Sequence, residues 1–357
     1  MTATASEHTP VAEVPGSGGT RLVDRVFKMR ELAILVVFLV MIAVTQAGNS
    51  EFLSAQGIKD LLLNATILVL VATGQSLVVI TRNVDLSVGS TLGITAFAAG
   101  DHLHGGGNPV VAIALAVLLG VGCGLLNGTL VSFGQVPALV VTLGTLYIIR
   151  GVDSIWVGSR QITAADLPGG FNDFGSGGLS AIPWLALIAL AVLVATAYYL
   201  KHFGSGRELY ALGSNPEAAR LAGIPVRKRI IAAYTVCGAL TGLAGAMYLA
   251  RFGNVDSSTG SGYELTVVSA VVVGGVVFTG GSGSVYGAAL GALLLTSINS
   301  VLPALGVSSV WVLAINGLLL LLAIAVDRIV ALRVAAALKK KSALKRTATS
   351  KENPSHA

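Results

Sequence analysis

The stretch GSNPEAARLAGIPVRKRIIAAYTVCGALTGLAGAMYLA (residues 213–250) decides how this chain can fold. Its second half, 230–250, is a predominantly apolar run long enough for a helix to cross a bilayer, which takes about 20 residues. Its first half is short and polar and carries the end signals of a helix. A chain that alternates such runs with short polar connections is predicted to be an all-α, polytopic membrane protein.

Composition supports this prediction. The 357 residues have a mean hydropathy of +0.80 and only 11% charged side chains, less than half the roughly 25% of an ordinary soluble domain. The 44 glycines fit transmembrane helices that pack closely. Cys123 and Cys237 each lie inside an apolar run, so we interpret them as small buried hydrophobes and not as a disulfide or metal pair.

The apolar runs give ten candidate spans. Two of them, 86–100 and 265–278, are short and flanked by Gly or Ser, so either can be a broken or re-entrant element, which would reduce the count to eight or nine. The ten runs are 32–47, 58–80, 86–100, 109–131, 136–157, 182–200, 230–250, 265–278, 285–301 and 307–326. They define a transmembrane domain over 31–328, a disordered tail over 1–30 and a basic tail over 329–357 that lies against anionic lipid head groups.

The basic residues predict the orientation. With ten spans and the N-terminus inside, 19 of the 23 Lys and Arg residues fall on one side, and cytoplasmic connections retain positive charge. The exceptions are Lys59, Arg150, Arg160 and Arg251. Both termini and the segment 213–229 are therefore predicted to be cytoplasmic. A cleavable signal peptide is the alternative for the first span, but the polar leader is long and no A-x-A-like site follows. The net charge is +6, but no aromatic residues are interleaved with the basic ones, so the charge does not indicate nucleic-acid binding.

The polar half of the opening stretch predicts a rigid helix over about 215–223. Asn215 is an N-cap, Pro216 suits the first helical position and Glu217 complements the helix dipole. Gly223 supplies the left-handed residue at the end, and Pro225 prevents continuation. Two turns are too short to be stable alone, and an Ala and Leu face would be exposed. The residues alone allow either a linking turn or a docking element for a partner.

Several separated motifs resemble one family. GSNPEAARLAGIPVRKRIIAAYTVCGALTGLAGAMYLARFG is followed by GSGYELTVVSAVVVGGVVFTGGSGSVYGAALGALLL, and GQSLVVITRNVDLSVGS and PALVVTLGTLYIIRG precede both. Together they are similar to the membrane permease subunits of ABC-type carbohydrate importers, the ribose-type permeases, over roughly residues 30–328. The resemblance implies the fold of a type II ABC importer permease in the bacterial plasma (inner) membrane.

The resemblance also implies the partners. These are an ABC ATPase that holds ATP and Mg, a periplasmic or lipoprotein sugar-binding protein, and a second permease chain, either a copy or a paralogue. In such families an Ala-Ala-x-x-x-Gly helix enters a groove on the ATPase, and Ala218, Ala219 and Gly223 match this pattern. The implied coupling residues are Ser214, Asn215, Pro216, Glu217, Ala218, Ala219, Arg220 and Gly223. The chain itself is predicted to bind no cofactor and catalyse nothing, since it contains no G-x-x-x-x-G-K-[ST] loop and no Gly-Lys dipeptide.

Polar groups within the spans are candidate functional residues because they are costly in a bilayer. For Arg82, Asn83 and Asp85 the alternatives are an N-cap of the next span, a second contact to the ATPase, or a gate at the inner end of the pathway. Arg150 and Asp153 lie three apart, as an ion pair or a solute contact. A sugar needs neutral polar partners, although each such residue can equally bond a neighbouring helix. The candidates are Asn64, Thr73, Gln75, Thr95, Asn127, Thr142, Thr145, Asn299 and Asn316.

Other chemistries have weak support. His102 and His104 lack further ligands nearby, so no metal site is predicted, and the glycines of 280–287 indicate a tight turn. An ion-coupled secondary transporter is the alternative function, disfavoured because the span interiors hold almost no carboxylates or His. A membrane enzyme lacks any nucleophile and base set. The predicted function is a permease subunit that imports a monosaccharide or sugar-like solute.

Overall fold

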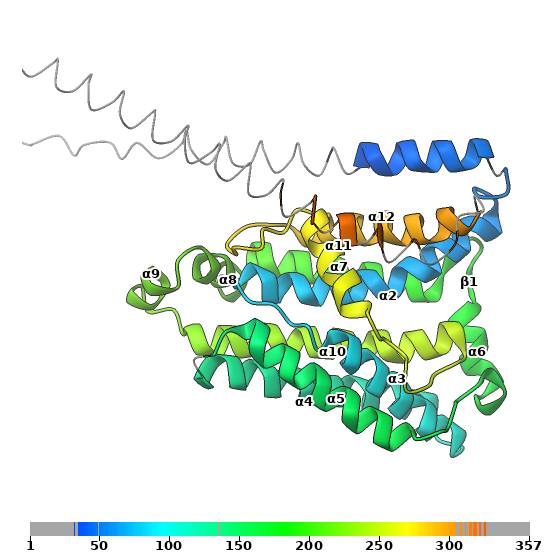
Figure 1. The fold of residues 1–357 in the computed structure, drawn as a ribbon, viewed down its shortest axis with the longest axis horizontal. Coiled ribbons are helices and arrows are strands. Elements are labelled where there is room, and N and C mark those ends of the chain that lie inside the picture. Colours follow the sequence, from blue (N-terminus) through cyan, green and yellow to red (C-terminus); the bar gives the residue numbers. More distant parts are fainter. Residues whose placement is uncertain are drawn as a thin grey trace, which may run out of the picture.

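The protein is a bundle of helices running along one axis (Figure 1). The computed structural model describes residues 32, 35–48, 50–134, 136–304 and several positions between 308 and 325. The two predicted tails, Asn316 and most of the predicted last span 307–326 lie outside the described residues.

Six helices of the described part are long and apolar enough to cross a membrane. They are α2 (Ala55–Ile80), α4 (Pro109–Gly134), α5 (Ala138–Val157), α7 (Trp184–His202), α10 (Val226–Phe252) and α12 (Val285–Ala304). Two apolar helices are shorter, Leu35–Gly48 and α11 (Tyr263–Val273). Helix α3 (Val88–His104) has 17 residues. The fold class predicted from the sequence is therefore confirmed, while a count of ten spans is not.

The remaining elements belong to the connections. They are the 3-10 helix η1 (Ala164–Asp166), α6 (Gly169–Ser176), α8 (Gly204–Ser214), α9 (Pro216–Leu221) and the two-stranded antiparallel sheet of β1 (Gly178–Leu179) and β2 (Ile182–Pro183). Of these, only α9 was expected from the sequence. We call the two ends of the bundle the α9 end and the α6 end (Figure 1).

The short run 265–278 ends earlier than expected. Gly275 adopts a φ of +95°, its N–H donates to the carbonyl of Val272, and the N–H of Val276 donates to Val271. This pair of bonds is a Schellman motif, which terminates a helix at a left-handed glycine. Residues 274–284 consequently form a turn at the α9 end, and α11 covers only part of the bundle's length.

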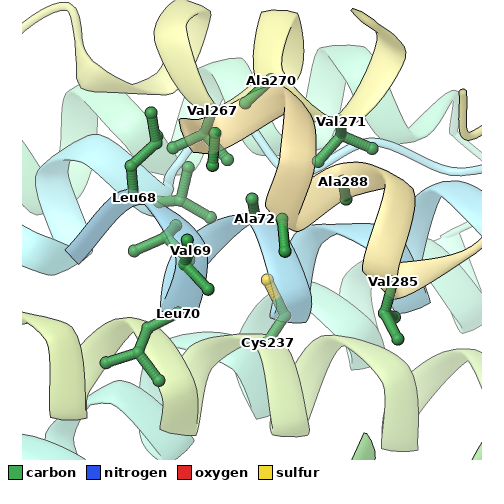
Figure 2. Packing of buried hydrophobic residues seen from close by; sticks show 14 of the residues in the cluster. Leu68, Val69, Leu70, Ala72, Cys237, Val267, Ala270, Val271, Val285 and Ala288 are labelled. Atoms are coloured by element: carbon green, nitrogen blue, oxygen red, sulfur yellow. The ribbon is translucent and has the colours of Figure 1, made fainter. Parts of the chain in front are cut away.

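Helix α2 lies at the centre, buried from Leu63 to Ile80 with the single exception of Asn64. Figure 2 shows its residues Leu68, Val69 and Ala72 packed among side chains of α10, α11 and α12, including Cys237. The Cys237 side chain is fully buried, as predicted, whereas Cys123 is only half-buried. Both cysteines are free.

Helices α4 and α10 approach each other most closely through glycines. A Cβ on Gly120 would collide with the backbone of Gly238 and Gly242, and a Cβ on Gly238 would collide with Gly120 and Gly124. Small residues at such spacing allow two backbones to meet within a membrane. Some of the glycines noted in the sequence thus allow α4 and α10 to pack closely.

The outward surfaces of α4, α5 and α7 are apolar. Leu118 of α4 is 66% exposed, Ile155 of α5 is 85% exposed, and Leu190 of α7 is 54% exposed. In water this surface would be a large uncovered hydrophobic patch. It is the surface expected of a multi-pass membrane protein whose helices face lipid or another membrane chain.

Candidate functional site

Helix α9 has well-formed caps at both ends. The Asn215 Oδ1 accepts hydrogen bonds from the N–H groups of Glu217 and Ala218, each at 3.1 Å. At the other end Gly223 has a φ of +79°, its N–H donates to Arg220, and the N–H of Ile224 donates to Ala219. Both ends therefore satisfy backbone groups that a two-turn helix would leave open, which makes α9 a stiff element.

The exposed face of α9 differs from the expected one. Ala219 is only 4% exposed, because α9 packs against α8 and α10 of the same chain. Ala218 and Gly223 remain exposed, and the Leu221 side chain at the end of the helix is 85% exposed. The expectation of an Ala and Leu face open to a partner is thus wrong for Ala219 and holds for Ala218 and Leu221.

The base of α9 is joined to the central helix. Gly213 lies against the carbonyl of Ile80, which is the last residue of α2, and a Cβ there would clash with it. The N–H of Gly281 donates to the same carbonyl at 2.9 Å, and the Tyr210 hydroxyl donates to the Gly283 carbonyl at 3.1 Å. Three segments distant in sequence therefore meet at the α9 end.

The three candidate gate residues lie in different surroundings. Arg82, with a φ of +67°, is exposed beside Gly280 at the α9 end. The Asn83 Nδ2 donates to the carbonyl of Thr81 at 3.0 Å. Asp85 is 2% exposed. Arg82 alone of the three is exposed next to the base of α9.

Asp85 holds an irregular segment inside the bundle. Its Oδ1 accepts from the Ser87 N–H at 2.9 Å, the Ser87 hydroxyl at 2.7 Å and the Asn127 Nδ2 at 3.3 Å. The preceding carbonyl of Val84 accepts from the Tyr234 hydroxyl at 3.0 Å and the Thr142 hydroxyl at 3.3 Å. Backbone outside helices is tolerated at membrane depth only when protein groups satisfy it, and these side chains do so.

The prediction of Asp85 as N-cap of the next span is wrong. Helix α3 begins at Val88, its N-cap is Ser87, and no side chain bonds its first N–H groups. The chain turns over Ser87 first, so the Asp85 carboxylate stabilises that turn. Asn127 and Thr142, two candidate solute residues, are used here to bond neighbouring elements.

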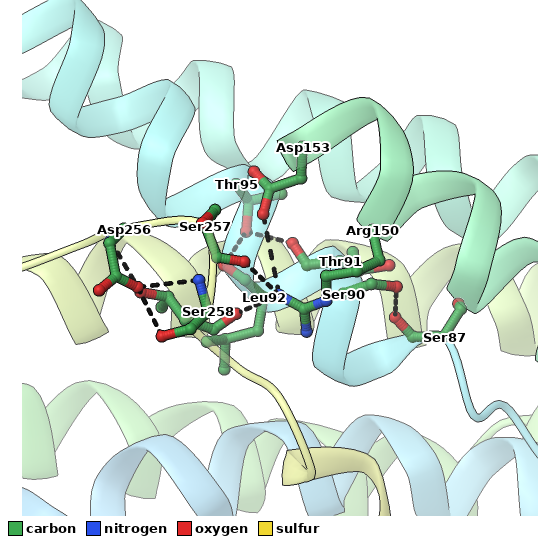
Figure 3. Close-up of polar contacts among 11 residues, drawn as sticks. Ser87, Ser90, Thr91, Leu92, Thr95, Arg150, Asp153, Asp256, Ser257 and Ser258 are labelled. Atoms are coloured by element: carbon green, nitrogen blue, oxygen red, sulfur yellow. Dashed lines mark hydrogen bonds and ion pairs between the residues drawn. The ribbon is translucent and has the colours of Figure 1, made fainter. Parts of the chain in front are cut away.

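A second polar cluster joins α5, α3 and the connection 253–262 (Figure 3). The Arg150 Nη1 donates to the carbonyl of Thr259 at 2.6 Å and of Ser257 at 3.4 Å. It lies 3.8 Å from the Asp153 carboxylate, which is fully buried and has no hydrogen-bond partner in the described chain. The predicted Arg150 and Asp153 pair exists, and Arg150 points inward, where it fastens this connection to α5.

Helices α3 and α11 begin next to each other inside the bundle. Gly89, in the first turn of α3, packs against Gly260 and against Glu264 in the first turn of α11, and a Cβ there would clash with both. The segment 81–87 reaches this point from the α9 end, and 253–262 reaches it from the α6 end (Figure 1). The two short apolar runs are therefore the broken elements that the sequence allowed.

A polar cavity of about 300 Å³ lies beside the connection 253–262. Hydrogen bonds from the Ser258 hydroxyl and N–H hold the pKa of Asp256 below its usual range, so this carboxyl is ionised at neutral pH. The cavity is lined by Tyr248, Asn254, Asp256, Ser258, Thr259, Gly260, Ser261 and Tyr263. None of these was a candidate from sequence. The polar run before a short apolar run was the available signal, because such a loop has to enter the bundle to reach its helix.

The remaining candidate solute residues have varied surroundings. Asn64 and Asn299 line a cavity of about 460 Å³ between α2 and α12. Gln75 is buried, with Cys237 Sγ 3.7 Å from its Oε1. Thr73, Thr95 and Thr145 each donate to a carbonyl of their own helix. Hydroxyls that donate to their own helix have their hydrogen bond made without a solute.

Comparisons with known proteins agree with this architecture. A family model described as branched-chain amino acid transport system / permease component matches residues 57–324. The autoinducer 2 import system permease protein LsrC of Salmonella typhimurium (strain LT2) is 38% identical over 295 residues, which is 82% of this chain and 84% of the relative. The ribose import permease protein RbsC of Escherichia coli (strain K12) is 35% identical over 314 residues, which is 87% of this chain and 97% of the relative.

The six long apolar helices define a multi-pass membrane protein, and the matches show that it is a transport subunit. The comparisons make the assignment specific: the chain belongs to the family of ABC importer permease components. It is a non-catalytic transport component, as the sequence predicted. The alternative of an ion-coupled secondary transporter receives no support from these relatives.

Proposed function

We propose that this permease conducts a monosaccharide or sugar-like solute, delivered by a soluble binding protein, in response to ATP hydrolysis on a partner ATPase. The relatives named for ribose and autoinducer 2 import support a sugar-like solute. The family description names branched-chain amino acids, so the solute class is the point that needs a test. ATP and Mg are expected on the ATPase and no cofactor on this chain.

The observation that carries the proposal is the attachment of α9. Its caps make it stiff, and Gly213 and Gly281 join its base to the last carbonyl of the central helix. An ATPase that moves α9 would displace α2 and the segment 81–87 that follows it. The expected ATPase contact comprises Asn215, Pro216, Glu217, Ala218 and Leu221 of α9, flanked by Ser214, Arg220, Gly223 and Arg82. Ala219 supports this face from behind.

A second permease chain, a copy or a paralogue, is expected against α5. The outward face of this helix carries Gly144 and Gly151, and a Cβ on either would meet nothing within 4 Å. Tyr147 is 71% and Ile155 is 85% exposed on the same helix, whereas its inward face holds Thr142, Thr145 and Asp153. Such a helix has a polar side that faces the bundle and an outward side on which two glycines allow close contact with another helix.

The test replaces Leu221 by Glu in the complete importer. Because this side chain is 85% exposed, the substitution leaves the fold intact and puts a charge where an apolar contact is expected. Loss of a central apolar contact typically costs 2 kcal/mol or more, so we expect ATPase binding to weaken by roughly 30-fold or more. ATPase co-purification and uptake of D-ribose and L-leucine into vesicles are measured.

The control is Leu179→Glu, since Leu179 is 66% exposed in β1 at the α6 end. It should retain the ATPase. Normal co-purification and transport by the Leu221→Glu variant would show that α9 does not couple the two subunits. Uptake of L-leucine in place of D-ribose by the unaltered importer would reject the proposed solute class.

A further inference from the structure

We propose that the cavity beside the connection 253–262 is a subsite for a neutral, polyhydroxylated solute. Its volume of about 300 Å³ lies at the lower end of the roughly 300–1,000 Å³ range of small-molecule sites. It lies toward the α6 end, between the end of α10 and the beginning of α11. The inference rests on the function proposed above and adds the place where the solute is bound.

The lining presents hydrogen-bonding groups that the protein leaves unused. Neither the Tyr248 nor the Tyr263 hydroxyl has a hydrogen-bond partner within the described chain. The three hydrogen bonds to the Asp256 carboxylate all end on Oδ1, which leaves Oδ2 as an acceptor. The Asn254 Oδ1 accepts from Gln161 at 2.8 Å, so its Nδ2 is left as a donor. Hydroxyl groups both donate and accept, and this set complements them.

The same lining discriminates against an amino acid. Among the described residues, no Lys, Arg or His lines the cavity, so a solute carboxylate would meet the ionised Asp256 without a lining cation. Arg150 is turned to the carbonyls of Ser257 and Thr259 behind the connection. A branched aliphatic side chain would also find no aliphatic wall. The two tyrosines are packed against the apolar core, and the Tyr248 ring centroid lies 4.6 Å from that of Phe252, so we expect them to contribute to the cavity mainly through their hydroxyls.

The site is held in place before a solute arrives. Ile162 and Val255 exchange backbone hydrogen bonds of 3.0 Å on one side of the connection, and Arg150 fixes the other side. Asp256 itself closes a turn with Ser258. A preformed arrangement reduces the free energy spent on ordering a loop around a weakly binding solute.

The test is ligand-observed NMR on the full chain in lipid nanodiscs, with D-ribose, L-rhamnose and L-leucine as probes. We expect at least one sugar to bind and L-leucine not to bind. The double variant Tyr248→Phe, Tyr263→Phe removes two hydroxyls without changing the packing volume, and we expect sugar affinity to fall by about tenfold. Tyr198→Phe is the matched control, since Tyr198 is 57% exposed on the outward side of α7, and it should bind as the unaltered chain does.

Several outcomes would overturn the subsite. These are no sugar binding by the unaltered chain, unchanged affinity in the double variant, or binding of L-leucine that the double variant abolishes. If uptake falls while sugar affinity stays the same, the cavity serves the docking of the binding protein instead. If the assembled importer carries sugar equally well with the double variant, the subsite is wrong and the proposed function stands. If the unaltered importer carries only L-leucine, the proposed function itself fails.

Discussion

Asp85 shows how one buried residue can hold a membrane protein's irregular backbone. A carboxylate buried away from water is costly unless it is well hydrogen-bonded. Here the carboxylate accepts hydrogen bonds from the Ser87 N–H, from the Ser87 hydroxyl and from Asn127 on α4. Asn127 also donates to the Ser87 hydroxyl at 2.7 Å. This network fixes where α3 begins, and therefore where the two broken helices meet.

We predict that Asn127→Ala destabilises the protein by about 1–3 kcal/mol, the usual cost of removing a partner from a buried or charged acceptor. The measurement is reversible unfolding by SDS from mixed micelles. Thr129→Ala on the same helix is the control, since Thr129 is exposed and bonds only its own helix at the Leu125 carbonyl. Equal stability losses in the two variants would show that Asn127 does not support Asp85.

For single residues, the sequence predicted which polar side chains matter in the spans, but it did not predict which groups they bond. Arg150 and Asp153 were expected to pair, and they do, but the carbonyls that Arg150 bonds come from residues more than 100 positions later. Asp85 was expected either as a cap, which a carboxylate before a helix often is, or as part of an inner gate. Besides the nearby Ser87, its partner is Asn127, which is 42 residues away, and no local pattern reveals such a contact.

At the scale of the element, helix contact depends on which side of α4 each glycine occupies. Gly120 and Gly124 face α10, where an added Cβ would collide with backbone atoms. Gly122 faces outward, with nothing within 4 Å of its Cβ position. The same substitution at two positions on opposite sides of one helical turn should therefore have different effects on stability.

We predict that Gly120→Ala lowers the stability by about 1–3 kcal/mol, as overpacking of a close contact does. Gly122→Ala should be neutral or stabilising by up to about 1 kcal/mol, because alanine has the higher helix propensity. Apparent Tm values in detergent distinguish the two variants. If Gly120→Ala proves as stable as Gly122→Ala, then α4 and α10 are less tightly packed than described.

The positions of the helices were the part of this fold that the sequence predicted best. Caps on Asn215 and Gly223 depend on neighbours within a few residues, so α9 could be located from the sequence alone. The short runs that become α3 and α11 were recognised as possible broken or re-entrant elements because their lengths conflict with a full crossing. What could not be predicted is that Ala219 is covered by its own chain, since that depends on how α8 and α10 converge.

At the scale of the whole molecule, charge is distributed unequally between the ends. Seven of the basic residues described lie at the α9 end: Arg82, Lys201, Arg207, Arg220, Arg227, Lys228 and Arg229. Within the described part of the chain, Arg220 and Arg229 are the two of these that form ion pairs, with Glu217 and Glu208. Elsewhere Arg160 and Arg251 are paired with Asp101 and Asp60, while Lys59 is in no ion pair among the described residues. Most of the unpaired positive charge therefore lies at the α9 end.

Because of this charge asymmetry, the orientation of the chain in the membrane tests the proposed contact between α9 and the ATPase. Positive connections stay in the cytoplasm, and an ATPase can reach α9 only from that side. We predict that a membrane-impermeant maleimide labels Leu179→Cys in intact spheroplasts and labels Leu221→Cys only after permeabilisation. Both side chains are well exposed, at 66% and 85%, so accessibility depends on the side of the membrane. The unaltered chain gives the background, since Cys123 and Cys237 lie within apolar helices. The reverse labelling pattern would place α9 outside the cell, where no ATPase could bind it, and would reject both the orientation and the coupling role of α9.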